Sequence, residues 1–163
     1  MISKKIKDGI TGNINIPSDK SISHRSIIIP SISMGISEIN NLLMSDDVLH
    51  TLDALKTLGV KIEKANDKII IYGKGLNSLK KPKKNIYLGN SGTSARLLTG
   101  LLASQKFESV LEGDHSLSTR PMSRIIDPLK LMGAKFENIS GTLPLKIIGK
   151  KLNKSKIEIE IPS

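Results

Sequence analysis

An internal repeat constrains the fold of this chain more than any other feature. Arg25 has a counterpart in Arg96, about 71 positions further on. At an offset of about 74, Asp53, Leu55, Lys56, Gly59, Lys61 and Glu63 recur as Asp127, Leu129, Lys130, Gly133, Lys135 and Glu137. This many identities at a nearly constant offset indicate two copies of one structural unit.

The hydrophobic pattern and the turn signals predict the same order of elements in each copy. The first copy predicts strands at 13–16, 35–43, 60–63 and 68–72. Its first helix is capped by Ser18 or Asp19 and ends at Pro30. Its second helix is capped by Ser45 or Asp46 and ends at Gly59.

The second copy begins with a strand at 85–88, a turn at 89–92 and a helix at 93–103. Together the copies predict an α/β (α+β) fold of two related βαβαββ units, joined by a connector at 74–84. The alternating segment 156–161 predicts one more strand.

The charge of the chain favours anionic partners. Twenty-five Lys and Arg against 15 Asp and Glu give a net charge of +10, which suits nucleic acids, membrane surfaces or small acidic metabolites. Two Tyr, two Phe and no Trp leave few rings for stacking on bases, so a nucleic-acid partner is not expected. We expect the lysines around Pro82 to form a solvated loop face.

The sequence contains neither a cysteine nor a secretory signal. Its cysteine count of zero excludes a disulfide framework and fits a reducing compartment. No segment approaches the roughly 20 apolar residues of a membrane span. We therefore expect a cytoplasmic protein without a membrane partner.

The first motif that suggests chemistry is PSDKSISHR at 17–25, at the start of the first helix. Unpaired backbone N–H groups and the helix dipole make such a terminus an anion site. Lys20 adds a point charge, Ser21 a hydroxyl donor and Arg25 a bidentate donor for carboxylate or phosphate. A capped surface helix with exposed basic side chains is the alternative.

The second motif is the glycine-rich turn LGNSGTSAR at 88–96. Glycines let backbone amides approach an anion closely and permit a positive φ. The spacing is not that of a Walker A loop. A tight turn alone would explain the motif, but its place in the repeat, equivalent to the first basic motif, favours a binding site.

The third motif is GDHSLSTRPMSR at 113–124, in which Arg120 precedes Pro121. Proline suits the first helical position, so we expect Arg120 at the mouth of a helix beginning at Pro121. The equivalent position in the first copy holds Asp46. A purely structural position would have less reason to exchange an acid for a base.

No metal site or cofactor is expected. His24, His50 and His115 do not have metal-ligand spacing, and we expect each to be a polar surface or packing residue. Asp46 and Asp47 could act as paired carboxylates, but helix capping explains them more simply.

Taken together and in this order, PSDKSISHR, LGNSGTSARLL and GDHSLSTRPMSRIIDPLKLMGA closely resemble the 5-enolpyruvylshikimate-3-phosphate (EPSP) synthase family. The resemblance covers essentially the whole chain. It implies two globules, each of three βαβαββ units packed as an inside-out α/β barrel. Residues 1–16 would then belong to the second globule, and residues 17–163 to an incomplete first globule with units at about 17–80 and 84–155 and a third unit starting afterwards.

The resemblance also implies a reaction and roles for seven residues. The enolpyruvyl group of phosphoenolpyruvate would be transferred to the 5-hydroxyl of shikimate 3-phosphate, releasing phosphate, in chorismate and aromatic amino-acid biosynthesis. Lys20 would be catalytic and contact both substrates. Ser21 and Arg25 would hold shikimate 3-phosphate. Phosphoenolpyruvate would be held by Asn90, Gly92, Thr93 and Arg120.

Family members are more than twice as long as this chain and typically monomeric, and their second globule supplies the acid/base carboxylates. We therefore expect this chain to be inactive without a complementing C-terminal portion. Two alternatives stay open. One is a non-catalytic anion-binding or regulatory remnant of this fold. The other is a UDP-N-acetylglucosamine enolpyruvyl transferase, although that family lacks the signature found at 19–25.

Overall fold

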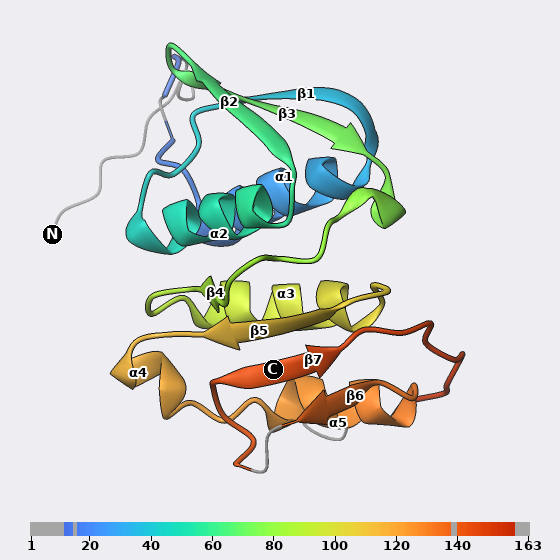
Figure 1. Cartoon of the computed structure of the whole chain (residues 1–163). Helices are drawn as coiled ribbons and strands as arrows, with labels where there is room; N and C mark the ends of the chain where they lie inside the picture. The colour runs from blue at the N-terminus through green and yellow to red at the C-terminus, as the bar shows by residue number, and fades with distance from the viewer. Residues whose placement is uncertain (1–11, 15, 138–139, 159–163) are drawn as a thin grey trace, which may run out of the picture.

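The computed structural model describes residues 12–14, 16–137 and 140–158. An antiparallel sheet and then a mixed sheet follow one another along the chain, and each has its own helices (Figure 1). A single apolar core runs through both sheets and their helices and includes Ile27, Leu55, Leu98 and Leu145. The predicted mixture of helices and strands is thus confirmed.

The first sheet is formed by β1 (Met34–Asn40), β2 (Lys61–Ala65) and β3 (Lys68–Lys74), in the order β1-β3-β2. Both pairs are antiparallel. β2 and β3 form the predicted hairpin, with Asn66 at a φ of 53° in the turn. The helices α1 (Lys20–Ile32) and α2 (Asp46–Thr57) cover one face of this sheet (Figure 1). A short 3-10 helix, η1 (Leu76–Ser78), follows β3.

The second sheet has the order β4-β5-β7-β6, and its strands are β4 (Ile86–Tyr87), β5 (Glu108–Glu112), β6 (Lys135–Glu137) and β7 (Leu145–Ile148). β4 and β5 are parallel, and the other pairs are antiparallel. The helices are α3 (Gly92–Ala103), α4 (His115–Ser118) and α5 (Ser123–Leu131). α2 contacts both β4 and α3, so it lies between the two halves.

Helix starts and faces follow from the local sequence. The Asp19 carboxylate accepts a hydrogen bond from the Ile22 N–H at 2.7 Å and caps α1. Ser45 occupies the cap position of α2 without a side-chain hydrogen bond to the helix. Val48, Leu52 and Leu55 form the buried face of α2 at helical spacing, as predicted.

The prediction that the first helix stops at Pro30 is wrong, because α1 continues to Ile32. Pro30 lies in the last turn, so its missing N–H removes a hydrogen bond near the helix end rather than in its middle. Hydroxyl groups bond to nearby carbonyls there: Ser33 Oγ donates to Ile29 O at 2.8 Å. Ser33 N also donates to Pro30 O at 3.2 Å and closes the helix.

Two strand predictions at the ends of the chain also fail where they can be judged. Residues 13, 14 and 16 are not in a strand, nor are residues 156–158. Residues 15 and 159–161 lie outside the described residues. A strand needs a neighbour for its backbone hydrogen bonds, and none of the described strands pairs with either segment. β1 consequently has no strand on its outer edge within the described ranges, whereas β5 has β4 there.

Candidate functional site

The first basic motif leads into α1 and forms its first turn and a half, with Lys20, Ser21 and Arg25 exposed and His24 buried. Lys20 Nζ lies 2.8 Å from Asp47 Oδ2, so the lysine is joined to the first turn of α2. Ser21 and Arg25 are exposed and, at i and i+4, share one face of the helix. Neither side chain has a hydrogen bond or ion pair with another described residue, which leaves both donors available to a ligand.

The second motif is a tight turn that requires glycine at position 89 and places Gly92 beside two arginine side chains. Gly89 has a φ of 55°, and a Cβ there would lie 2.4 Å from the His50 ring. Gly92 begins α3, where a Cβ would lie 2.9 Å from Arg96 Nη1 and 3.1 Å from Arg120 Nη1. The Ser91 hydroxyl caps α3 by accepting from Ser94 N at 3.3 Å. The turn therefore lies directly against two guanidinium groups.

Arg120 reaches this turn, although not from the predicted helix mouth. Pro121 is not the first helical residue, since α5 begins only at Ser123. The buried Met122 donates its N–H to Gly141 O at 2.8 Å, and this holds the segment before α5 in a non-helical link. From that link, Arg120 Nη2 donates to Asn90 Oδ1 and, at 3.4 Å, to Ser116 Oγ.

The two equivalent arginines of the repeat have different surroundings. Arg96 donates to Gly92 O at 3.1 Å and to Pro121 O at 3.2 Å, so it fastens the glycine turn to the segment that carries Arg120. Arg25 has no such protein partner among the described residues. The repeat predicts that the two arginines are equivalent, but only the folded contacts show that Arg96 serves the backbone.

A buried chain of hydrogen bonds connects the second turns of α1 and α2 with the first turn of α3. His24 Nδ1 lies 2.9 Å from Thr51 Oγ1, which lies 2.5 Å from Ser94 Oγ. Ser94 Oγ lies 2.6 Å from Ser91 Oγ. All four side chains are buried. Burial lowers the pKa of His24, with the Asp47 carboxylate opposing this shift and Lys20 adding to it.

The structure thus groups the predicted residues in three sets. Asn90, Gly92 and Arg120 are in mutual proximity, and Thr93 follows on α3. Ser21 and Arg25 share a face, and Lys20 lies beside α2. Residue types and spacing did not single out Thr51 or Ser94, and they assigned Asp47 to helix capping rather than to the ion pair that it forms with Lys20. The sequence gives little indication of these contacts, because the Lys20–Asp47 pair joins residues 27 positions apart and the Thr51–Ser94 pair joins residues 43 positions apart.

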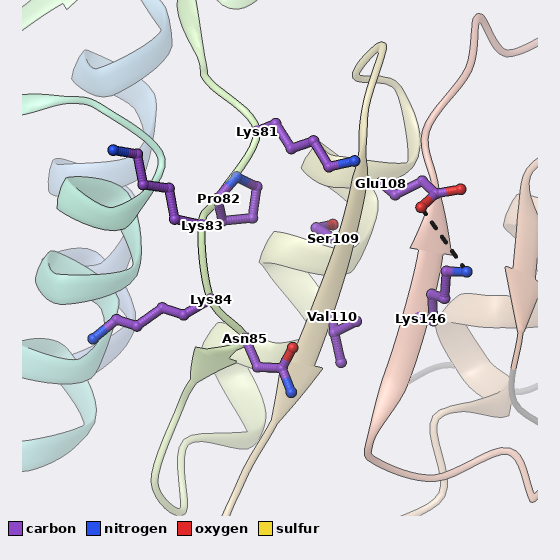
Figure 2. Close-up of a pocket in the computed structure, with 9 residues that line it drawn as sticks. All are labelled: Lys81, Pro82, Lys83, Lys84, Asn85, Glu108, Ser109, Val110 and Lys146. Carbon is purple, nitrogen blue, oxygen red and sulfur yellow. Dashed lines mark ion pairs between the residues drawn. The ribbon is translucent and has the colours of Figure 1, made fainter.

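The lysine run around Pro82 lines a separate small cavity of about 170 Å³ (Figure 2). Figure 2 shows Lys81 extending toward β5, whereas the ammonium groups of Lys83 and Lys84 point away from it. The only acid in the lining, Glu108, lies 3.9 Å from Lys146 Nζ. None of the predicted site residues lines this cavity, and its lysines fit the expected solvated loop face.

The chain is similar to known proteins of a single enzyme family. The family model for EPSP synthase (3-phosphoshikimate 1-carboxyvinyltransferase) matches residues 4–163. The chain belongs to the EPSP synthase family. The 3-phosphoshikimate 1-carboxyvinyltransferase of Ruthia magnifica is 53% identical over 145 residues, which are 89% of this chain and 33% of the relative. That of Lactiplantibacillus plantarum is 44% identical over 95% of this chain and 36% of the relative.

A solved EPSP synthase from Acinetobacter baumannii superposes with a TM-score of 0.87 at 44% identity, over 93% of this chain and 35% of that chain. The predicted α/β fold of the EPSP synthase type is therefore confirmed. The chain spans about a third of the length of the relatives it matches. In the part of the chain that the structure describes, no helix is long and apolar enough to cross a membrane.

Proposed function

We propose that this chain forms one wall of the site in which an EPSP synthase transfers the enolpyruvyl group from phosphoenolpyruvate to shikimate 3-phosphate. The observation that carries the proposal is the His24–Thr51–Ser94 contact, because it ties the second turn of α1 to the first turn of α3. The two anion-binding motifs therefore lie at neighbouring helix N-termini. Each terminus presents unpaired N–H groups and a positive dipole end.

In this proposal, Ser21 and Arg25 bind shikimate 3-phosphate from their shared face of α1. Arg25 carries a planar fork of donors that suits a phosphate, and no ion pair within the described residues occupies it. Lys20, with side-chain exposure of 51%, can turn its remaining ammonium protons toward either substrate. Its contact with Asp47 limits the positions that the ammonium group can adopt.

Phosphoenolpyruvate is bound in this proposal by the glycine turn and Arg120. Gly92 lets the backbone approach the ligand, and Asn90 and Thr93 offer polar groups beside it. Asn90 orients the Arg120 guanidinium through its amide oxygen. Arg96 holds the two segments together from behind.

The chemistry follows from bringing two multiply charged anions together. The Lys and Arg side chains offset the repulsion between the substrates and stabilise charge that develops on the departing phosphate. The shikimate 5-hydroxyl gives up its proton and adds to C2 of phosphoenolpyruvate while C3 is protonated. Phosphate then leaves the tetrahedral intermediate as C3 loses a proton, which restores the double bond of the enolpyruvyl group. No metal or cofactor is part of this proposal.

The proposal assigns the acid/base carboxylates to polypeptide beyond this chain, because relatives are about three times as long. It includes the assignment of residues 1–16 to a second globule and a third unit after about 155. It also includes that the complete enzyme is monomeric and located in the cytoplasm. A remnant that binds anions without catalysis is the alternative that an activity assay distinguishes.

The test combines the chain with a separately produced C-terminal portion of a relative and measures phosphate release from both substrates. We expect turnover from the mixture and none from the chain alone. Lys20→Ala and Arg25→Ala should each weaken shikimate 3-phosphate binding by about tenfold or more, given roughly 1.5–3 kcal/mol per charged hydrogen bond. Lys64→Ala, on an exposed lysine of β2, is the matched control. Unchanged binding in both site variants would contradict the assignment.

A further inference from the structure

His24 is a fully buried titratable residue to which the proposed reaction assigns no task. Its ring lies inside the basic motif, one residue before Arg25, yet it points to the protein interior and contacts Thr51 of α2. Its Nε2 atom is buried and has no hydrogen-bond partner among the described residues. A buried ring nitrogen without a hydrogen-bond partner lowers the stability of the folded chain. The position of His24 beneath a proposed binding turn therefore needs a physical explanation.

The distances around Thr51 allow an ordered set of donors and acceptors. Thr51 Oγ1 donates to Asp47 O at 3.2 Å, and its lone pairs accept from His24 Nδ1–H and from the Ser94 hydroxyl. Ser94 Oγ in turn accepts from the Ser91 hydroxyl. Ser91 Oγ accepts from Ser94 N–H. In this arrangement every hydroxyl proton has its own acceptor.

This order requires the neutral ring with its proton on Nδ1. The other neutral tautomer would place an N–H on Nε2, where no described residue offers an acceptor, and would take the Thr51 proton away from Asp47 O. The doubly protonated ring would add a buried charge to the same unmatched position. The contacts therefore favour a single protonation state of His24.

The hydrogen-bonded chain connects the two turns that are proposed to bind substrates, residues 20–25 at the start of α1 and residues 88–93 at the start of α3. These are called the substrate turns below. At one end His24 lies one helical turn after Lys20, and Lys20 is also fastened to α2 through Asp47. At the other end Ser91 caps α3 directly after the glycine turn. Of these polar side-chain contacts between described residues, two join α2 to α1 and one joins it to α3, and all of them lie in the first two turns of α2.

We propose that His24, Thr51 and Ser94 act as positioning residues that couple the two substrate turns through α2. The inference rests on the proposed function for the identity of the ligands. Ordering of the α1 turn by shikimate 3-phosphate fixes Thr51 through His24, and Thr51 fixes Ser94 and the cap of α3. The second anion then binds to a turn that is already ordered.

The substitutions that test this inference all lie on α2. Thr51→Val removes the hub oxygen while nearly preserving the shape of the side chain, and Thr51→Ser retains the hydroxyl. Thr57→Val is the matched control, because Thr57 Oγ1 makes the same kind of bond to a carbonyl four residues earlier, Asp53 O at 2.8 Å, on an exposed face.

The measurement is the affinity of the 163-residue chain for phosphoenolpyruvate, with and without shikimate 3-phosphate, followed by the amide signals of residues 88–93. We expect shikimate 3-phosphate to raise this affinity by about fivefold or more in the unmodified chain, within the usual range of coupling between sites. Thr51→Val should reduce the effect to less than about twofold, while Thr51→Ser and Thr57→Val retain it. Coupling that survives in Thr51→Val would overturn the inference.

A ligand-free measurement separates this inference from the proposed function. If neither substrate binds the unmodified chain, the proposed function fails for this chain, and the amide spectra still decide the positioning role. Thr51→Val should then shift the amide signals of both 20–25 and 88–93, while Thr57→Val shifts neither. The imidazole nitrogen spectrum should show His24 protonated at Nδ1 only. An unmoved 88–93 segment or a proton on Nε2 would overturn the inference.

Discussion

Lys20 Nζ and the Asp47 carboxylate are 2.8 Å apart and join the first turn of α1 to the first turn of α2. Lys20 belongs to the basic motif proposed to bind both substrates, and Asp47 belongs to a helix with no predicted site residue. The side chain of Asp47 is only 24% exposed. A residue to which the proposed function assigns no substrate contact thus restrains one that is proposed to contact both.

Replacing Asp47 with Asn should affect ligand binding more than stability. Partly exposed ion pairs contribute roughly 0–1 kcal/mol to folding, so we expect thermal unfolding to shift by at most a few degrees. Binding of shikimate 3-phosphate should weaken several-fold because Lys20 loses its restraint. Calorimetry and a binding titration measure the two effects. Glu38→Gln, which breaks the 2.8 Å pair with Lys68 in the first sheet, should leave binding unchanged.

Gly89→Ala should destabilise the chain by about 1–3 kcal/mol. The residue has a φ of 55°, and the new Cβ would overlap the His50 ring at 2.4 Å. Gly100→Ala is the control, because a Cβ at this position within α3 meets no atom within 4 Å. That change should stabilise the chain by about 0.5–1 kcal/mol through helix propensity. Urea unfolding measures both, and equal effects would contradict the description of the turn.

The stability of the chain should fall as the pH drops below the ordinary His pKa of about 6.5. Burial lowers the pKa of His24 in the folded chain. Between the unfolded and the folded pKa, the unfolded state binds more protons, so acidification favours unfolding. Above the unfolded pKa both states are neutral at His24, and this contribution does not change with pH.

The pH effect is measured by urea unfolding between about pH 7.5 and 5. His24→Gln should be less stable at neutral pH but should lose part of the slope over this window. His115→Gln, at an exposed position on α4, should retain the slope of the unmodified chain. The Asp47 carboxylate raises the pKa of His24 in the folded chain, so Asp47→Asn should leave the onset of the slope unchanged and extend the slope to lower pH.

The outer edge of β1 should make the chain self-associate at high concentration. Met34 and Ile36 on this strand are 83% and 68% exposed, and no described strand pairs with that edge. Open apolar edge strands favour pairing between molecules. Ile36→Lys should lower the proportion of larger species in sedimentation velocity. Lys64→Ala on β2 should not, and association unaffected by Ile36→Lys would place the contact elsewhere.

The sequence alone determined the repeat, most of the secondary structure and the three motifs. Apolar spacing on α2, the cap at Asp19 and the turn at Asn66 depend on residues close together along the chain. Local backbone and side-chain preferences act between residues this close together, so these features can be predicted from the sequence. The motif order was also specific enough to indicate the family.

Only the tertiary structure decided which side chains meet. Pro121 lies outside α5, in a segment where the Met122 N–H bonds to Gly141 O, and Arg96 bonds to backbone carbonyls while its counterpart Arg25 does not among the described residues. The His24–Thr51–Ser94 chain and the Lys20–Asp47 pair depend on how α1, α2 and α3 pack. Such contacts depend on the packing of a shared core rather than on spacing along the chain, and the two copies of the repeat, though similar in sequence, therefore have different surroundings.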